Sequence, residues 1–261
     1  MPSPLLDQVR ADAAAHGLNL FGLVDRQRFD AGERVERRAG QLARECGTIL
    51  VLGSGGRALA QAFGRWRSGQ HRPVAAVAAF ALAAVERVAA TLRARLGPCA
   101  VVEFGGSCKL HAGRLGEAAG FGIVSPVSGL LLHPEFGPWV RVRGALLLRG
   151  HPFGEVADAS LAETFHPCCG CPRPCLSACP ASVSDGLGHH DLVRCASHRH
   201  GGGCIDECST RRACPVGAQH RDSEADSHRH TYELASMRRW AGFGVWRFVP
   251  ARWRGGPLRE G

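Results

Sequence analysis

Two stretches decide the fold of the C-terminal part of this chain: CCGCPRPCLSACP at residues 168–180 and CIDECSTRRACPVG at residues 204–217. Together with Cys195, they hold nine of the twelve cysteines in the sequence. Each stretch ends its run of cysteines in a Cys-Pro pair. Closely spaced thiolates favour iron–sulfur clusters, zinc or Cu(I). The pattern therefore predicts a metal-binding region whose ligands come from both stretches.

The spacing of the first stretch points to iron–sulfur clusters. It reads C-x2-C-x3-C-x3-C-P, one residue longer in the second gap than the C-x2-C-x2-C-x3-C-P run of bacterial two-cluster ferredoxins. In those proteins the fourth cysteine binds the other cluster. When Cys169 is set aside, eight cysteines remain, as two [4Fe–4S] clusters require. This crossover rule predicts a first set, Cys168, Cys171, Cys175 and Cys214, and a second set, Cys179, Cys195, Cys204 and Cys208.

Two other chemistries also use closely spaced cysteines. A disulfide scaffold needs an oxidising compartment, and residues 1–17 lack the basic start and apolar core of a secretory signal. We therefore expect reduced thiols and a cytoplasmic protein. Zinc also accepts four thiolates, although zinc sites usually use two separate C-x2-C hooks. A zinc-stabilised binding module remains an alternative.

Length, composition and charge set broad limits on the protein. The chain has 261 residues, 45% of them hydrophobic, which is enough to bury a core in one or two domains. The formal net charge is +9, and Lys109 is the only lysine. An arginine-, alanine- and glycine-rich composition often reflects coding bias, so we do not expect a nucleic-acid partner. The longest apolar run, residues 74–85, is shorter than the roughly 20 residues of a membrane span.

Hydrophobic periodicity organises the rest of the chain. Strands are expected at residues 19–24, 48–52, 100–104, 130–132 and 140–148, and helices at 4–16, 33–45, 58–66, 74–96 and 110–119. This alternation predicts an α+β fold with an α/β-like domain over residues 1–150. A small two-cluster ferredoxin-like domain follows at 151–232, and a basic aromatic tail occupies 233–261.

Several isolated features received structural interpretations. GSGG at 53–56 lies between a strand and a helix, as a phosphate loop does, but its spacing favours a tight turn. Cys46 and Cys99 lie beside strands and are expected to be structural. Cys108 adjoins Lys109, which could lower its pKa. The histidines at 189–190, 198–200 and 228–230 are interpreted as solvated loop residues, since cysteines suffice as ligands.

The order of these parts resembles the epoxyqueuosine reductase family, which is related to corrinoid-dependent reductive dehalogenases. The matching segments are GLNLFGLVD at 17–25, CGTILVLG at 46–53, AGFG at 119–122, LLLHPEFGPWV at 130–140 and the cysteine stretches with Arg194–Cys195. The likeness covers most of residues 5–216. The PCLSACP and ACPVG segments are also similar to short bacterial proteins called ferredoxins. The family resemblance implies an N-terminal cobalamin-binding domain, and therefore cobalamin as a possible cofactor.

Two departures from the family concern its active site. The family's V-D-[ST]-x-P segment, whose Asp is taken as the proton donor, corresponds to VEFGG at 102–106. The resemblance thus implies Glu103 as a candidate catalytic acid. In the segment A-G-x-G-W-I-G-K-N-T, Ile123 replaces the Trp and Pro126 replaces the Lys. The resemblance therefore supports the iron–sulfur clusters more strongly than it supports the family's reaction on tRNA.

From these observations we expect an electron-transfer protein with two [4Fe–4S] clusters that moves single electrons. A cobalamin-dependent reductase related to epoxyqueuosine reductase is the alternative. The expected partners are a redox protein and, in the N-terminal domain, a small-molecule acceptor. The tail carries Trp240, Trp246 and Trp253 among arginines. It could bind a partner, a membrane surface or RNA, or pack back over the cluster domain.

Overall fold

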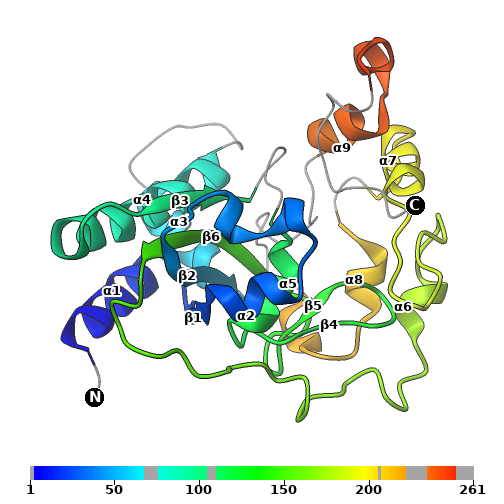
Figure 1. The fold of residues 1–261 in the computed structure, drawn as a ribbon. Coiled ribbons are helices and arrows are strands. Elements are labelled where there is room, and N and C mark those ends of the chain that lie inside the picture. The colour runs from blue at the N-terminus through cyan, green and yellow to red at the C-terminus, as the bar shows by residue number, and fades with distance from the viewer. Residues whose placement is uncertain (1–2, 68–75, 105–109, 205–206, 222–233, 251–261) are drawn as a thin grey trace.

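The computed structural model describes residues 3–67, 76–104, 110–204, 207–221 and 234–250 (Figure 1). A four-stranded sheet has the order β1-β2-β6-β3, formed by β1 (Leu20–Asp25), β2 (Cys46–Gly55), β6 (Val140–Arg149) and β3 (Ala100–Glu103). A small second sheet pairs β4 (Ile123–Val124) with β5 (Leu131–Leu132). The helices that accompany the sheets are α1 (Pro4–Ala15), α2 (Arg26–Ala31), α3 (Ala58–Arg67), α4 (Ala76–Leu96) and α5 (Ala112–Ala118).

Every strand pair in the larger sheet is antiparallel, so the expected α/β-like arrangement is wrong while the α+β class is confirmed. The longest pairing joins β2 to β6, which are far apart in the sequence. Alternating helices and strands indicate a parallel sheet only if each connection crosses to the opposite end of the sheet. Here α2 and the turns after it return the chain to the end where β1 finished, so β2 runs antiparallel to β1.

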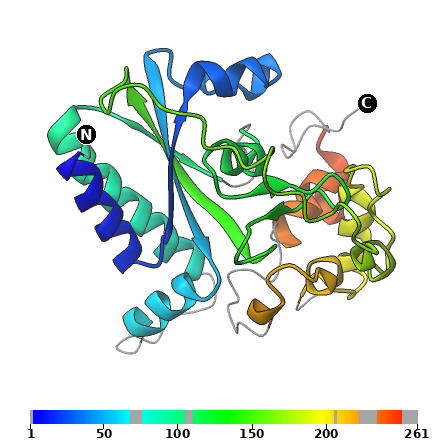
Figure 2. The ribbon, with the colours of Figure 1, turned by 90° about the horizontal axis from the view of Figure 1, so that it is seen from below.

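The sheet separates two hydrophobic layers (Figure 2). Side chains alternate along a strand, so neighbours in sequence point to opposite faces. On one face, Leu50, Leu52, Leu146 and Leu148 pack against α1, α3 and α4. On the other face, Ile49, Val51, Ala145 and Leu147 join a cluster with residues of α2 and α5. Both faces of β2 and β6 are therefore buried, which explains their nearly continuous apolar sequences.

The helix predicted at residues 33–45 is wrong. The chain forms α2 earlier, because the Asp25 carboxylate accepts a hydrogen bond from the Arg28 amide at 2.8 Å and caps it. Residues 35–41 form two short 3-10 turns, η1 (Val35–Arg37) and η2 (Ala39–Gln41). The buried Asp30 carboxylate accepts hydrogen bonds from the amides of Ala39 at 2.7 Å and Gly40 at 3.1 Å. These side-chain bonds replace helical ones.

The GSGG segment is mostly strand, and its tight turn begins only at Gly56, where φ is +56°. A Cβ at Gly53 would meet the Phe121 ring at 2.8 Å, and a Cβ at Gly55 would meet the Phe136 ring. The glycines therefore make room for two aromatic side chains. Among the described residues, no helix is both long and apolar enough to cross a membrane.

The cysteine-rich region (residues 168–217) is packed against the loop between β5 and β6. Gly137 (φ +55°) and Gly217 (φ +65°) touch through their backbones. A Cβ at Gly137 would meet the Val216 carbonyl oxygen, and one at Gly217 would meet the Phe136 carbonyl group. Since both glycines also have left-handed backbones, no other residue suits either position without strain.

We predict that Gly217→Ala loosens this contact. A matched control is Gly154→Ala, because Gly154 also has a positive φ (+81°) but has open space where a Cβ would lie. The control should lose about 1–2 kcal/mol of unfolding free energy from backbone strain. Gly217→Ala should lose a further ~1–3 kcal/mol, because its Cβ must displace packed backbone. Urea denaturation measures both variants, and equal losses would contradict the contact.

Candidate metal centre

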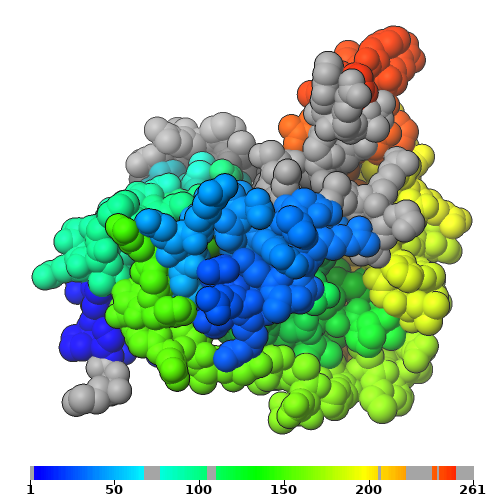
Figure 3. Space-filling model, in the orientation of Figure 1, coloured from blue at the N-terminus to red at the C-terminus, as the bar shows by residue number. Residues whose placement is uncertain are grey.

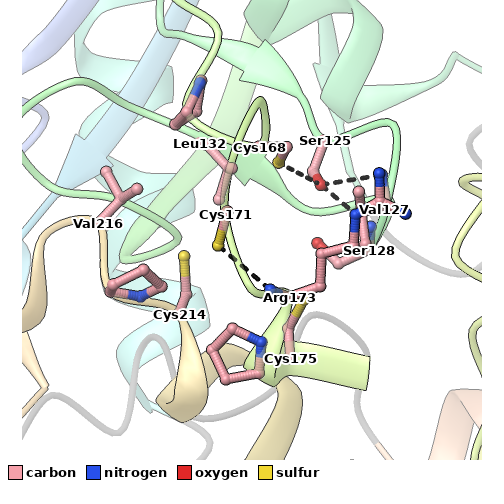
Figure 4. A pocket seen from close by; sticks show the side chains of 13 residues that line it. Ser125, Val127, Ser128, Leu132, Cys168, Cys171, Arg173, Cys175, Cys214 and Val216 are labelled. Carbon is pink, nitrogen blue, oxygen red and sulfur yellow. Dashed lines mark hydrogen bonds between the residues drawn. The ribbon is translucent and has the colours of Figure 1, made fainter. Parts of the chain in front are cut away.

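Four of the predicted cysteine ligands surround one hollow (Figure 4). They are Cys168, Cys171, Cys175 and Cys214, the first set of the crossover prediction. The hollow measures about 360 Å³, part of it open solvent. Residues outside the cysteine-rich region complete the wall, among them Ser125, Val127, Ser128 and Leu132. The structure thus brings together thiols that are up to 46 residues apart in the sequence. It places them against the turn between β4 and β5.

Local backbone geometry places these thiols. Arg173 has a left-handed backbone (φ 54°), which turns the chain directly before α6 (Pro174–Ser177). Pro174 occupies the first turn of α6, where its missing amide hydrogen is not needed, and Cys175 follows it. Cys214 follows α8 (Ser209–Ala213), and α8 packs against α6. Contact between these two short helices brings the second cysteine stretch to the first.

Ser125 is a site residue that sequence reasoning missed. Its hydroxyl oxygen lies 3.3 Å from the sulfur of Cys168 and accepts hydrogen bonds from the amides of Val127 at 3.2 Å and Ser128 at 3.0 Å. The hydroxyl hydrogen is therefore available to donate to the sulfur. The Arg173 amide donates to the sulfur of Cys171 at 3.4 Å. In the sequence, a serine before a proline carried no signal for this role.

The four thiols also interact electrostatically. Burial raises the pKa of Cys175, and the neighbouring Cys168 and Cys171 raise it further. Burial likewise raises the pKa of Cys214, with smaller contributions from Cys175, Cys168 and Cys171. Crowded, partly buried thiols of this kind resist ionisation because their thiolates repel one another. A bound metal centre would remove that cost, since it supplies the positive charge.

The second predicted set also lies together. Burial raises the pKa of Cys195 to about 11, and the nearby Cys208, Cys179 and Cys204 contribute. Cys195 is on α7 (Leu192–His200), which Asp191 caps by accepting a hydrogen bond from the Arg194 amide at 2.9 Å. Cys204 has a left-handed backbone (φ 47°), and its sulfur lies 3.6 Å from the Ser209 hydroxyl.

Two buried arginines lie beside the second set. Arg199 is 6% exposed and Arg211 is 7% exposed. Burial lowers the pKa of both groups, while neighbouring cysteines act in the opposite direction: Cys195, Cys208 and Cys204 for Arg199, and Cys208 for Arg211. Positive charge beside a metal–sulfur centre favours its more negative, reduced state, because net charge is one of the terms that set the potential.

The described residues contain no group of three or more His, Cys, Asp or Glu placed to hold a single metal ion. The four cysteines of the first set line the hollow. The remaining described cysteines lie elsewhere. Cys46 is buried in β2, where desolvation raises its pKa to about 11, and Cys99 is half-buried with a raised pKa. Cys169 is exposed, and Cys108 lies outside the described residues.

The other predicted features, which are Glu103, the histidines and the tail, do not line the hollow where the structure describes them. Glu103 ends β3, is exposed, and pairs with Gly144 across the sheet. His198 and His200 were expected in a loop but lie on α7, and the ring of His200 stacks on Phe243. The tail begins with α9 (Leu234–Ala241), which packs against α7. One of the options left open for the tail, packing over the cysteine-rich region, is thus what α9 and Phe243 do.

Comparison with known proteins identifies the fold. An epoxyqueuosine reductase with a tRNA-Tyr stem loop aligns over 96% of this chain and 77% of its own, with 13% identity and a TM-score of 0.56. The enzyme from Streptococcus thermophilus aligns over 83% and 67%, with 14% identity and a TM-score of 0.53. A reductive dehalogenase described as B12-dependent aligns over 97% and 39%, with 16% identity and a TM-score of 0.56.

The chain therefore has the fold shared by epoxyqueuosine reductases and reductive dehalogenases, which the sequence resemblance predicted. It spans 66% of another epoxyqueuosine reductase and about two fifths of the dehalogenases. No family model and no curated protein matches the sequence.

The two adjacent cysteines that open the first stretch provide a direct test of the ligand prediction. Cys168 lines the hollow and Cys169 is exposed. We expect Cys168→Ser to lose about half of the bound iron, because one of two clusters loses a ligand, and Cys169→Ser to keep it all. Iron and sulfide analysis of protein purified without oxygen measures this. Equal losses, or a loss confined to Cys169→Ser, would overturn the ligand set.

Proposed function

We propose that this chain is an iron–sulfur oxidoreductase in which two [4Fe–4S] clusters pass single electrons towards the four-stranded sheet. The observation that carries the proposal is the hollow lined by Cys168, Cys171, Cys175 and Cys214. Its thiols come from both cysteine stretches, as the crossover rule of two-cluster ferredoxins requires. Proximity among Cys179, Cys195, Cys204 and Cys208 supports a second cluster.

The proposed roles of the residues follow from their positions. When bound, each cluster would accept and release one electron at a time. The first set would hold the cluster nearer the sheet, because Cys168 and Cys214 pack with Ile123 and Leu132 of the β4–β5 pair. The second set would hold the outer cluster, since Cys195 belongs to α7 and α7 lies on the side of the molecule away from α1 and α4 (Figure 1). Electrons would then pass from the outer set to the inner set.

The fold comparisons favour a reductase over a ferredoxin that only carries electrons. The sheet and its helices make up more than half of the chain, and the similar structures are named as reductases and dehalogenases. A carrier needs only its cluster-binding region, whereas a reductase also needs a place for its acceptor. A small-molecule acceptor at the sheet is therefore part of the proposal. Zinc, which also accepts four thiolates, is the alternative that metal and sulfide analysis separates from a cluster.

A corrinoid does not follow from the described residues. The AGFG and HPEFGPW segments belong to the family resemblance that implies a cobalamin-binding domain. In the structure, Phe121 and Trp139 are buried at 3% and 5% exposure, and the Phe136 ring stacks on His133 and meets the His220 ring edge-on. These side chains build the core and the contact with the cysteine-rich region, so support for the cobalamin-dependent alternative comes from the comparison with a B12-dependent dehalogenase. B12 dependence stays a property of the similar dehalogenase.

The proposal predicts about eight iron and eight sulfide atoms per chain after anaerobic purification. Dithionite should bleach the visible absorption and produce the electron paramagnetic resonance of reduced [4Fe–4S] clusters. Zinc without sulfide would refute the proposal. Added cobalamin is the companion measurement: a spectral shift on mixing would establish the corrinoid-dependent alternative for this chain.

Ser125→Ala should shift the reduction potential of the first cluster to a more negative value. The variant removes the hydroxyl that lies 3.3 Å from the sulfur of Cys168, and hydrogen bonds to sulfur stabilise the reduced cluster. Ser177→Ala is the matched control, because its hydroxyl donates to the Pro174 carbonyl oxygen and not to a sulfur. Potentiometric titration of both variants measures the shift. An unchanged first potential in Ser125→Ala would exclude this role.

A further inference from the structure

The end of the described chain forms a projection beside α7, the helix that carries Cys195 (Figures 1 and 3). We call residues 234–250 the arm. It consists of α9 and η5 (Gly244–Phe248). In two views, α7 and α9 lie on the side of the molecule away from α1 and α4 (Figures 1 and 2). The arm therefore stands at the outer end of the proposed electron path.

The arm is fixed to the helix that carries Cys195. Met237 of α9 is 2% exposed, and its sulfur accepts a hydrogen bond from the Arg199 guanidinium at 2.9 Å. The ring of Phe243 stacks on His200 with centroids 5.0 Å apart and an interplanar angle of 11°. Arg199 and His200 both belong to α7. A molecule bound to the arm would thus lie close to the second set of cysteines.

The outer part of the arm is apolar and basic. Val245 and Phe248 are each 75% exposed. The Arg247 guanidinium lies 4.6 Å from the centre of the Phe248 ring, and that of Arg239 lies 5.9 Å from the Trp246 ring. Residues 234–250 include three arginines and no Asp or Glu. Exposed aromatic and arginine side chains together are typical of protein interfaces.

We propose that the arm is the docking surface for a small acidic electron-carrier protein, and this rests on the proposed function. Two observations favour such a partner over other occupants. Residues 234–250 carry three arginines and no acidic side chain, so an acidic carrier complements the arm. It is also attached to α7, so a docked carrier would lie near the outer cluster. In each encounter the carrier loses one electron and the outer cluster gains it, and no bond forms or breaks.

The test compares two double variants of the full-length protein with clusters. Arg247→Glu/Phe248→Ala alters the arm. Arg34→Glu/Val35→Ala makes the same kind of change at an exposed pair on the sheet side, where Val35 is 56% exposed. The probe is a purified acidic plant-type [2Fe–2S] ferredoxin. Calorimetry of the oxidised proteins gives Kd, and stopped-flow absorption gives the rate of cluster reduction by the reduced carrier and, separately, by reduced methyl viologen.

We expect the arm variant to bind the carrier at least about tenfold more weakly and to be reduced by it at least about tenfold more slowly, at the low end of electrostatic steering effects. Its rate should also depend less on salt. Reduction by methyl viologen, which needs no docking, should be unchanged. The control variant should match the unmodified protein in every measurement.

Three results would overturn the docking proposal. One is carrier binding that is equal in both variants. Another is an equal loss of viologen and carrier reduction in the arm variant, which would make the arm a structural support. The third is that the arm variant loses binding to phosphatidylserine vesicles while carrier binding is unchanged, which would make the arm a membrane contact. Failure of the proposed function looks different, since protein without clusters would not be reduced by viologen at all.

Discussion

The meeting of three chain segments around one hollow is the constraint on which this structure depends. Cys168, Cys171 and Cys175 come from the loop before α6 and the start of α6, Cys214 follows α8, and Ser125 lies in the turn after β4. None of these segments is long enough to form a core alone. Thiol–metal bonds, where they form, convert binding energy into folding energy. The hollow is therefore both the candidate site and the organising centre of the C-terminal part of the chain.

A backbone contact joins the cysteine-rich region to the loop that precedes β6 of the four-stranded sheet. The loop before β6 and the segment after Cys214 approach until Gly137 and Gly217 touch. The apolar residues Ile123 and Leu132 then cover Cys214 from the side of the sheet. This contact gives the proposed inner cluster a fixed position relative to β6. A fixed position is what single-electron transfer to an acceptor at the sheet requires.

Charge follows the same layout. The cysteine sets would carry negative charge as thiolates, and buried arginines lie next to the outer set. Farther out, the arm adds exposed arginines and aromatic rings without an acidic residue. Arginines thus lie where an electron would enter the protein. At the sheet end, Glu103 remains a candidate acid whose role is a proposal from the family resemblance alone.

The sequence by itself predicted the grouping of the cysteines into two sets and determined most of the regular elements. Both rest on spacing: ligand gaps for the sets, and hydrophobic periods for β2, β6, α1 and α4. It also pointed to the fold of epoxyqueuosine reductases, although identity to those structures is only 12–14%. The sequence period says which residues face a core, but it does not say which strands become neighbours.

Only the tertiary structure decided the rest. The sheet is antiparallel because the chain returns to the end of the sheet where β1 finishes before β2 begins. Hydrophobic periodicity does not give the direction of a strand. Residues 33–45 failed to form a helix because Asp30 bonds to the amides of Ala39 and Gly40, a contact between distant positions that local propensity does not contain. Ser125 became part of the site for the same reason. Its hydroxyl gains a function only when the fold carries Cys168, 43 residues away in sequence, to within 3.3 Å.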